Sequence, residues 1–176
     1  MPPGTRAELG IVNTLLCRAL ARRFHTTPVP HVFTTLGRHR RLFRPWLRFA
    51  ARLMPYGTLD RADTELVILR VSVGCGSDYE WHQHVRPARQ AGLTAEQIER
   101  VGAGPGAAGW TGHQRALLRA TDQLITDRTV DDAVWQQLRQ AYNERQLIEL
   151  CLLAGHYAML AGTLNALGVR PENAAE

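Results

Sequence analysis

The segment that most constrains the fold is Leu66–Val73, LVILRVSV, because it suits two kinds of structure. Its β-branched residues are typical of a buried strand, but a strand needs a partner, and no other segment of the chain offers a comparable run. Asp60 and Asp63 precede it as helix caps do, and two glycines follow it. The segment therefore predicts a helix that begins at about Asp60, and with it an all-α protein.

Apolar residues recur at three- and four-residue spacing along most of the remaining chain, which also predicts helices. Proline and glycine clusters separate the periodic segments, among them the glycine-rich loop Gly102–Gly109, whose spacing is not that of a dinucleotide-binding fingerprint. Capping boxes open three of the expected helices, at Ser77–Glu80, Thr94–Gln97 and Asn143–Gln146. Besides the central ones, the expected helices are Thr5–Arg23, His31–Leu42, Pro45–Met54, Thr94–Val101, His113–Ile125, Asp131–Ala141 and Asn143–Leu167.

Composition restricts the classes of function. A chain of 176 residues with 45% hydrophobic and 21% charged residues is expected to fold as one domain. The net charge of +5 comes entirely from scattered arginines, without a nucleic-acid-binding motif, so we expect a small acidic substrate rather than nucleic acid. We divide the chain into an N-terminal helix and linker, 1–30, one domain, 31–172, and a tail, 173–176.

Cysteine usage and hydropathy indicate the compartment. The three cysteines are far apart and lack zinc-type spacing, as expected in a reducing cytoplasm. The N-terminus lacks the apolar core and cleavage site of a secretory signal. Glu149 and His156 interrupt the longest apolar run, Leu147–Leu167, which favours a buried helix over a membrane span. We therefore expect a soluble, cytoplasmic protein without a membrane partner.

Most of the reactive side chains lie between Asp60 and Leu93. At about 100° per residue, Ser77, Glu80 and His84 share one face of their helix, whereas His82 points the opposite way, toward solvent. An HxH pair on opposite faces does not favour a metal site, and we expect none. Of the two histidines, His84 is the better candidate for a partly desolvated functional site, although a satisfied core histidine is the simpler alternative.

Glu65 lies on the preceding helix, flanked by aliphatic side chains. Such surroundings should raise the pKa of its carboxyl group and prepare it as a general acid or base. An ordinary ion pair with an arginine is the alternative. Ser77 and Glu80 also have a plain structural explanation as a helix cap. Cys75 precedes a helix N-terminus, which can stabilise a thiolate, but a lone cysteine is more often inert.

Three segments together resemble the carboxymuconolactone decarboxylase and alkyl hydroperoxidase D superfamily. They are TELVILRVSVGCGSDYEWHQHV, AGLTAEQI and HYAMLAGTLNALGV, and the resemblance spans roughly His31 to Glu172. It implies an all-helical alkyl hydroperoxidase D-like fold for the domain, without a cofactor. It also implies a homo-oligomer, a trimer or hexamer, with sites near subunit contacts.

The peroxidase branch of this superfamily carries a glutamate, a CxxC pair and a histidine. Glu65 and His84 match the glutamate and the histidine, whereas Ser77 and Glu80 stand where the two cysteines would be. Without paired thiols, an internal disulfide cannot form during peroxide reduction. The departure moves the expected chemistry from thiol redox to acid–base catalysis.

What remains resembles the decarboxylase branch. The resemblance implies a cofactor-independent lyase or isomerase acting on a small acidic or lactone metabolite, with Glu65 and His84 as the proton-transfer pair and Glu80 as a second carboxylate. Around the pocket we expect Cys75, Ser77, Tyr79 and Trp81. The alternatives are a one-cysteine peroxidase that uses Cys75 with an external thiol, and a catalytically inactive binding or assembly module on the same scaffold.

Overall fold

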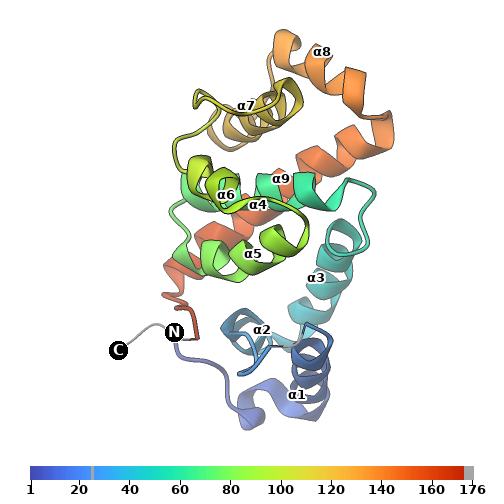
Figure 1. Ribbon diagram of the computed structural model, residues 1–176. Coiled ribbons are helices and arrows are strands. Elements are labelled where there is room, and N and C mark those ends of the chain that lie inside the picture. Colours follow the sequence, from blue (N-terminus) through green and yellow to red (C-terminus); the bar gives the residue numbers. More distant parts are fainter. Residues whose placement is uncertain (25, 173–176) are drawn as a thin grey trace.

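The structure, a computed structural model, describes residues 1–24 and 26–172, and within these ranges it consists of nine helices without a strand (Figure 1). The prediction of an all-α protein is confirmed. The expected tail, 173–176, lies outside the described residues. The helices are α1 (Arg6–Arg23), α2 (His31–Leu36), α3 (Arg40–Leu53), α4 (Arg61–Gly74), α5 (Asp78–Gln90), α6 (Ala95–Val101), α7 (Gly112–Thr126), α8 (Asp132–Ala141) and α9 (Glu144–Ala166).

Helices α4, α5 and α9 form the centre of the molecule (Figure 1). The run that suits either a strand or a helix is helical, and residues 64–69 of α4 are buried without interruption because α5, α7 and α9 surround that helix. In Figure 1, α7 and α8 lie at one end of this centre and α1 and α2 at the other, with α3 running between. The central helices therefore place their polar side chains inside the molecule.

The N-terminal helices differ from expectation at two places, a kink at Gly10 inside α1 and the boundary before α3. We expected a break before Pro45, but α2 ends at Leu36 and α3 begins at Arg40, with Pro45 inside it. The side chain of His39 accepts a hydrogen bond from the Leu42 amide and caps α3. Histidine is not among the residues that commonly cap the start of a helix, so the sequence pattern predicted this start too late, at Pro45.

The other helix boundaries agree closely with the sequence. Capping boxes are present at Thr94 and Asn143, as predicted, and Asp60 caps α4 by accepting from the Ala62 amide. Ser77 caps α5, but the expected return bond from the Glu80 side chain does not form. Gly168, with φ of 60°, follows the end of α9 as a stop signal requires.

Helix α9 is long and apolar enough to cross a membrane, yet half of its most apolar window is buried inside the protein. It contacts α3, α4, α5, α7 and α8, as expected for the core helix of a globular domain. Ile148, Leu152 and Met159 remain exposed along one side of it. The expected homo-oligomer stays a prediction, and this side is where a second subunit would bury apolar surface.

Candidate active site

The centre of the candidate site is a hydrogen bond between α4 and α5. His84 Nδ1 lies 2.7 Å from Glu65 Oε2, although the two residues are 19 positions apart in the sequence. Both side chains are buried: that of Glu65 is 0% exposed and that of His84 10%. The two residues that the family resemblance paired are therefore in direct contact.

Arg61 provides the second partner of Glu65. Its Nη2 lies 2.6 Å from Glu65 Oε1, one turn along α4, in an ion pair whose angle is not that of an aligned hydrogen bond. This is the arginine alternative considered for Glu65, and it replaces the purely aliphatic surroundings that the sequence suggested. Because the Arg61 side chain is 39% exposed, it connects the buried pair with solvent.

Glu80 is the carboxyl group that burial perturbs. It is 2% exposed, and neither of its oxygens forms a hydrogen bond with the described residues. Burial raises its pKa to about 8, and the nearby Ser77 hydroxyl offsets only part of this rise. Glu80 therefore carries a proton at neutral pH. It lies one turn before His84 on α5, so the two side chains point from the same helical face.

Ser77 and Cys75 lie at the start of α5. Ser77 is buried and accepts a hydrogen bond from the Glu80 amide, so it is a helix cap. Cys75 is partly buried, and burial followed by the charge of Glu80 raises the pKa of its thiol, whereas Arg128 lowers it. The thiol form of Cys75 therefore dominates at neutral pH.

The structure places Tyr79 away from this group. Its hydroxyl accepts from the Val32 amide and donates to Glu172, at 2.9 Å in each case, and its ring belongs to the apolar cluster between α2, α5 and α9. Trp81 is partly buried against the main core. His82 is exposed, as the face geometry predicted. Tyr79, one of the expected pocket residues, thus tethers α5 to α2 and to Glu172.

Tyr157, on α9, is a neighbour of the site that the sequence did not reveal. Its ring meets the His84 ring edge to face, with centroids 5.2 Å apart and planes at 86°. We refer to Glu65, His84 and Tyr157 as the inner cluster. Tyr157 lies 73 residues after His84, and helical periodicity relates residues within one helix only, so no local signal connects the two.

A second group of the same residue types lies outside the site. Asp63 Oδ2 accepts from the Tyr142 hydroxyl at 2.7 Å and lies 2.9 Å from His113 Nε2, and the tyrosine and histidine are 3.1 Å apart. We refer to Asp63, His113 and Tyr142 as the outer cluster. Each polar group that meets there has a partner within the cluster. It fastens the starts of α4 and α7 to the end of α8.

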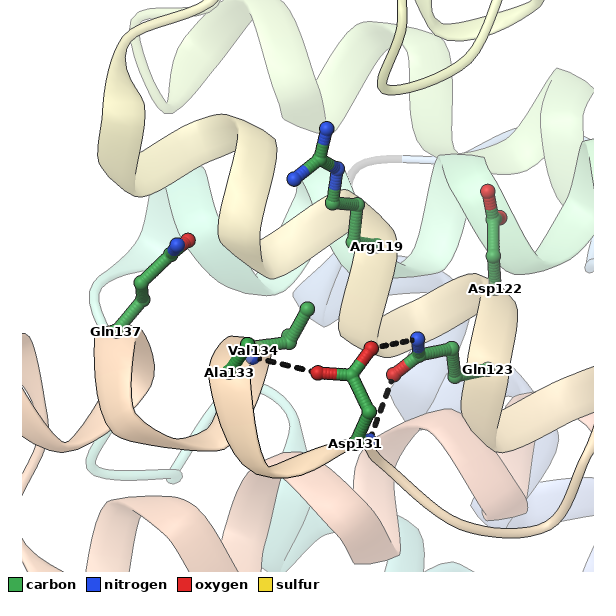
Figure 2. A pocket seen from close by; sticks show the side chains of 7 residues that line it. All are labelled: Arg119, Asp122, Gln123, Asp131, Ala133, Val134 and Gln137. Atoms are coloured by element: carbon green, nitrogen blue, oxygen red, sulfur yellow. Dashed lines mark hydrogen bonds between the residues drawn. The ribbon is translucent and has the colours of Figure 1, made fainter.

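The hollow between α7 and α8, about 320 Å³ in volume, contains none of the expected site residues. Figure 2 shows Asp131 in this hollow bonded to Gln123 and to a backbone amide at the start of α8. These bonds cap the helix and satisfy the polar groups concerned. Arg119, drawn in the same view, points away from Asp131. The hollow therefore reflects how the α7–α8 turn is built.

Comparisons with known proteins agree with this geometry. Residues 40–123 match the model of the carboxymuconolactone decarboxylase family, which here spans α3 to most of α7. No curated protein sequence matches the chain significantly.

Several solved structures share the fold. An uncharacterised peroxidase-related protein from Ralstonia eutropha JMP134, with an alkyl hydroperoxidase D core, superposes with a TM-score of 0.85 at 19% identity, over 98% of this chain and 92% of the other. A peroxidase-related protein from Silicibacter sp. TM1040 gives 0.83 at 16% identity, over 98% and 93%. The debrominase Bmp8 gives 0.79 at 14% identity, over 98% and 91%.

The fold is of the helical alkyl hydroperoxidase D type. The family match over residues 40–123 covers slightly less than half of the chain, and together with the fold it supports the resemblance to the carboxymuconolactone decarboxylase and alkyl hydroperoxidase D superfamily noted in the sequence. At these identities, the solved structures establish the fold alone.

Proposed function

We propose that the protein is a cofactor-independent acid–base enzyme, a lyase or isomerase, that acts on a small acidic or lactone metabolite. The observation that supports this most directly is the buried Glu65–His84 hydrogen bond of 2.7 Å. A carboxylate bonded to one imidazole nitrogen fixes the tautomer and leaves the other nitrogen for proton transfer. With Glu65 ionised, His84 donates through Nδ1, and Nε2 is the proton acceptor.

Glu80 supplies the complementary acid. Since its pKa is raised to about 8, Glu80 holds a proton at neutral pH and can donate it. In a decarboxylation, the electron pair of the breaking C–C bond passes into the conjugated system of the substrate, carbon dioxide leaves, and Glu80 protonates the carbanionic carbon. Solvent then restores the proton on Glu80. An isomerisation would use His84 to remove a proton and Glu80 to return one.

Arg61 is the group suited to an acidic substrate. Its guanidinium is partly exposed and lies beside the buried pair, where it can meet a carboxylate that arrives from solvent. Because its guanidinium makes no aligned hydrogen bond to Glu65, Arg61 can offer donors to a second carboxylate while it stays beside Glu65. We infer that Arg61 orients the acid group of the substrate while Glu65 retains His84.

The test is proton exchange at carbon in deuterated water, followed by NMR over a panel of small unsaturated acids and lactones. Wild-type protein should exchange or decarboxylate at least one member, and Glu65→Gln and His84→Ala should each lower the rate by about 10²–10⁴-fold with folding intact. Wild-type rates in both variants would reject the assignment. So would a wild-type protein that acts on no compound of the panel.

The alternative peroxidase depends on Cys75. Its raised thiol pKa disfavours the thiolate that peroxide chemistry requires. Peroxide consumption with an external thiol that is lost on alkylation of Cys75 would favour this alternative. A catalytically inactive scaffold would be favoured if Glu65 and His84 were separated. In the structure the two side chains are in direct contact.

A further inference from the structure

One buried side chain beside the proposed catalytic pair has no role in the mechanism above, that of Tyr157. Besides its contact with His84, its ring meets the ring of His156 at 5.3 Å and 87°, a second edge-to-face contact. Edge-to-face pairs have preferred geometries, because the electron-rich face of one ring attracts the electron-poor edge of the other. Tyr157 is thus held between two imidazoles in one orientation.

His84 needs such a neighbour. Among the described residues its ring forms one hydrogen bond, from Nδ1 to Glu65. A single bond fixes the direction of one nitrogen but leaves the plane of the ring free to tilt around that direction. The position of Nε2, at the far side of the ring, depends on this tilt. A misplacement of about 1 Å can cost on the order of 10²-fold in rate.

We propose that Tyr157 is a positioning residue, whose ring fixes the plane of the His84 imidazole so that Nδ1 stays on Glu65 while Nε2 keeps one place in the site. This rests on the proposed role of His84 in proton transfer. The ring contact itself is a property of the folded protein, with or without turnover.

The ring, rather than the hydroxyl, carries this role. No hydrogen bond joins the Tyr157 hydroxyl to another residue that the structure describes. Burial, and then the charges of Glu65 and Glu80, raise its pKa well above the ordinary value, so the group stays protonated. Phenylalanine should therefore replace Tyr157 without loss, whereas an aliphatic residue should not.

His156 supports Tyr157 from the other side. Burial lowers the pKa of His156 to about 4, so its ring is neutral at physiological pH and does not draw Tyr157 away by cation–π attraction. Trp46 and Phe49 of α3 pack on His156 in turn, with ring centroids 6.1 and 5.4 Å away. An uninterrupted row of aromatic contacts therefore extends from α3 to His84.

The experiment follows the ring nitrogens and the Nδ1 proton of His84 by NMR in the full chain labelled with ¹⁵N. Tyr157→Phe should leave both as in wild type. Tyr157→Leu should move the two nitrogen shifts toward the average of the two tautomers and speed exchange of the Nδ1 proton about tenfold or more. Tyr142→Leu is the matched control, since it removes a buried tyrosine packed on a histidine, His113, outside the site.

Unchanged His84 signals in Tyr157→Leu would overturn the proposal, and so would their loss in Tyr157→Phe, which would assign the effect to the hydroxyl. If the leucine variant does not fold, the wild type still decides, because absent Overhauser contacts between the two rings contradict the arrangement. No substrate is needed, so failure of the proposed function leaves this result readable. With a substrate in hand, Tyr157→Leu should lower kcat and leave KM nearly unchanged.

Discussion

The inner and outer clusters contain a carboxylate, a histidine and a tyrosine each, and their carboxylates lie two residues apart on α4. In the outer cluster the three side chains bond to one another in a triangle, and the His113 side chain is 35% exposed. In the inner cluster the carboxylate is fully buried, and the tyrosine touches the histidine through its ring. In the outer cluster Asp63 Oδ2, His113 Nε2 and the Tyr142 hydroxyl contact one another, whereas the inner one leaves His84 Nε2 and both Glu80 oxygens without a partner among the described residues.

The same residue types thus serve opposite purposes. A closed set of hydrogen bonds stabilises the fold, because each bond to a charged group contributes about 1.5–3 kcal/mol. A set with unsatisfied buried polar groups lowers the stability of the fold, and such groups are common at functional sites. Three measurements test the difference between the clusters.

The largest effect on stability should come from Glu80, which has no counterpart in the outer cluster. Its pKa is about 8 in the folded protein, compared with about 4.3 for a glutamate in an unfolded chain. Between these values the folded protein keeps a proton that the unfolded chain has lost, so the free energy of unfolding decreases as pH rises from about 4.5 to 8. The total should be on the order of 4 kcal/mol.

Urea denaturation of wild type and Glu80→Gln at pH 5 and pH 8 measures this decrease. The glutamine variant should lose most of it and should be more stable than wild type at pH 8. Glu99→Gln, at an exposed position of α6, is the control and should follow wild type. An equal pH dependence in Glu80→Gln and wild type would show that Glu80 is not held neutral by burial.

The two tyrosine hydroxyls should differ by a smaller amount. Tyr142→Phe removes a 2.7 Å hydrogen bond to Asp63 and should lower the free energy of unfolding by about 2 kcal/mol. Tyr157→Phe removes no hydrogen bond within the described residues and should change it by less than about 0.5 kcal/mol. Thermal and urea unfolding of both variants provide the measurement, and equal losses would erase the distinction between the clusters.

The smallest effect expected is that of His113 on turnover. Because the outer cluster lies outside the proposed site, His113→Ala should leave the proton-exchange rate within about twofold of wild type, while His84→Ala should lower it by about 10²–10⁴-fold. A rate that falls as far in His113→Ala as in His84→Ala would mean that the outer cluster belongs to the site.

The fold and the positions of Glu65 and His84 on their helical faces can be predicted from the sequence alone, because both depend on local periodicity. Glu65 and His84 lie on adjacent helices with readable faces, and the family pattern marks the same two residues. The same geometry separates Tyr79 from His84: five residues before His84, it is turned by about 140° from it, and its hydroxyl bonds to Val32 and Glu172.

Other features could not be reached in this way. Tyr157 joins the site through packing of α9, which no spacing rule predicts across 73 residues. Arg61 lies one turn before Glu65, so an i,i+4 pair was readable, but several arginines were equally available to a buried carboxylate. Glu80 is buried without a hydrogen-bond partner among the described residues because of the packing around α5, and a capping signature does not predict this.

The tether made by Tyr79 and Glu172 has a consequence for the start of α5. Glu172 also accepts from the His31 amide and the Gln83 side chain, so one carboxylate ties α2 and α5 to residue 172. Tyr79 stands between Ser77, which caps α5, and the buried Glu80. The segment that carries Glu80 is therefore anchored at its own first turn by contacts with the C-terminal end of the described chain.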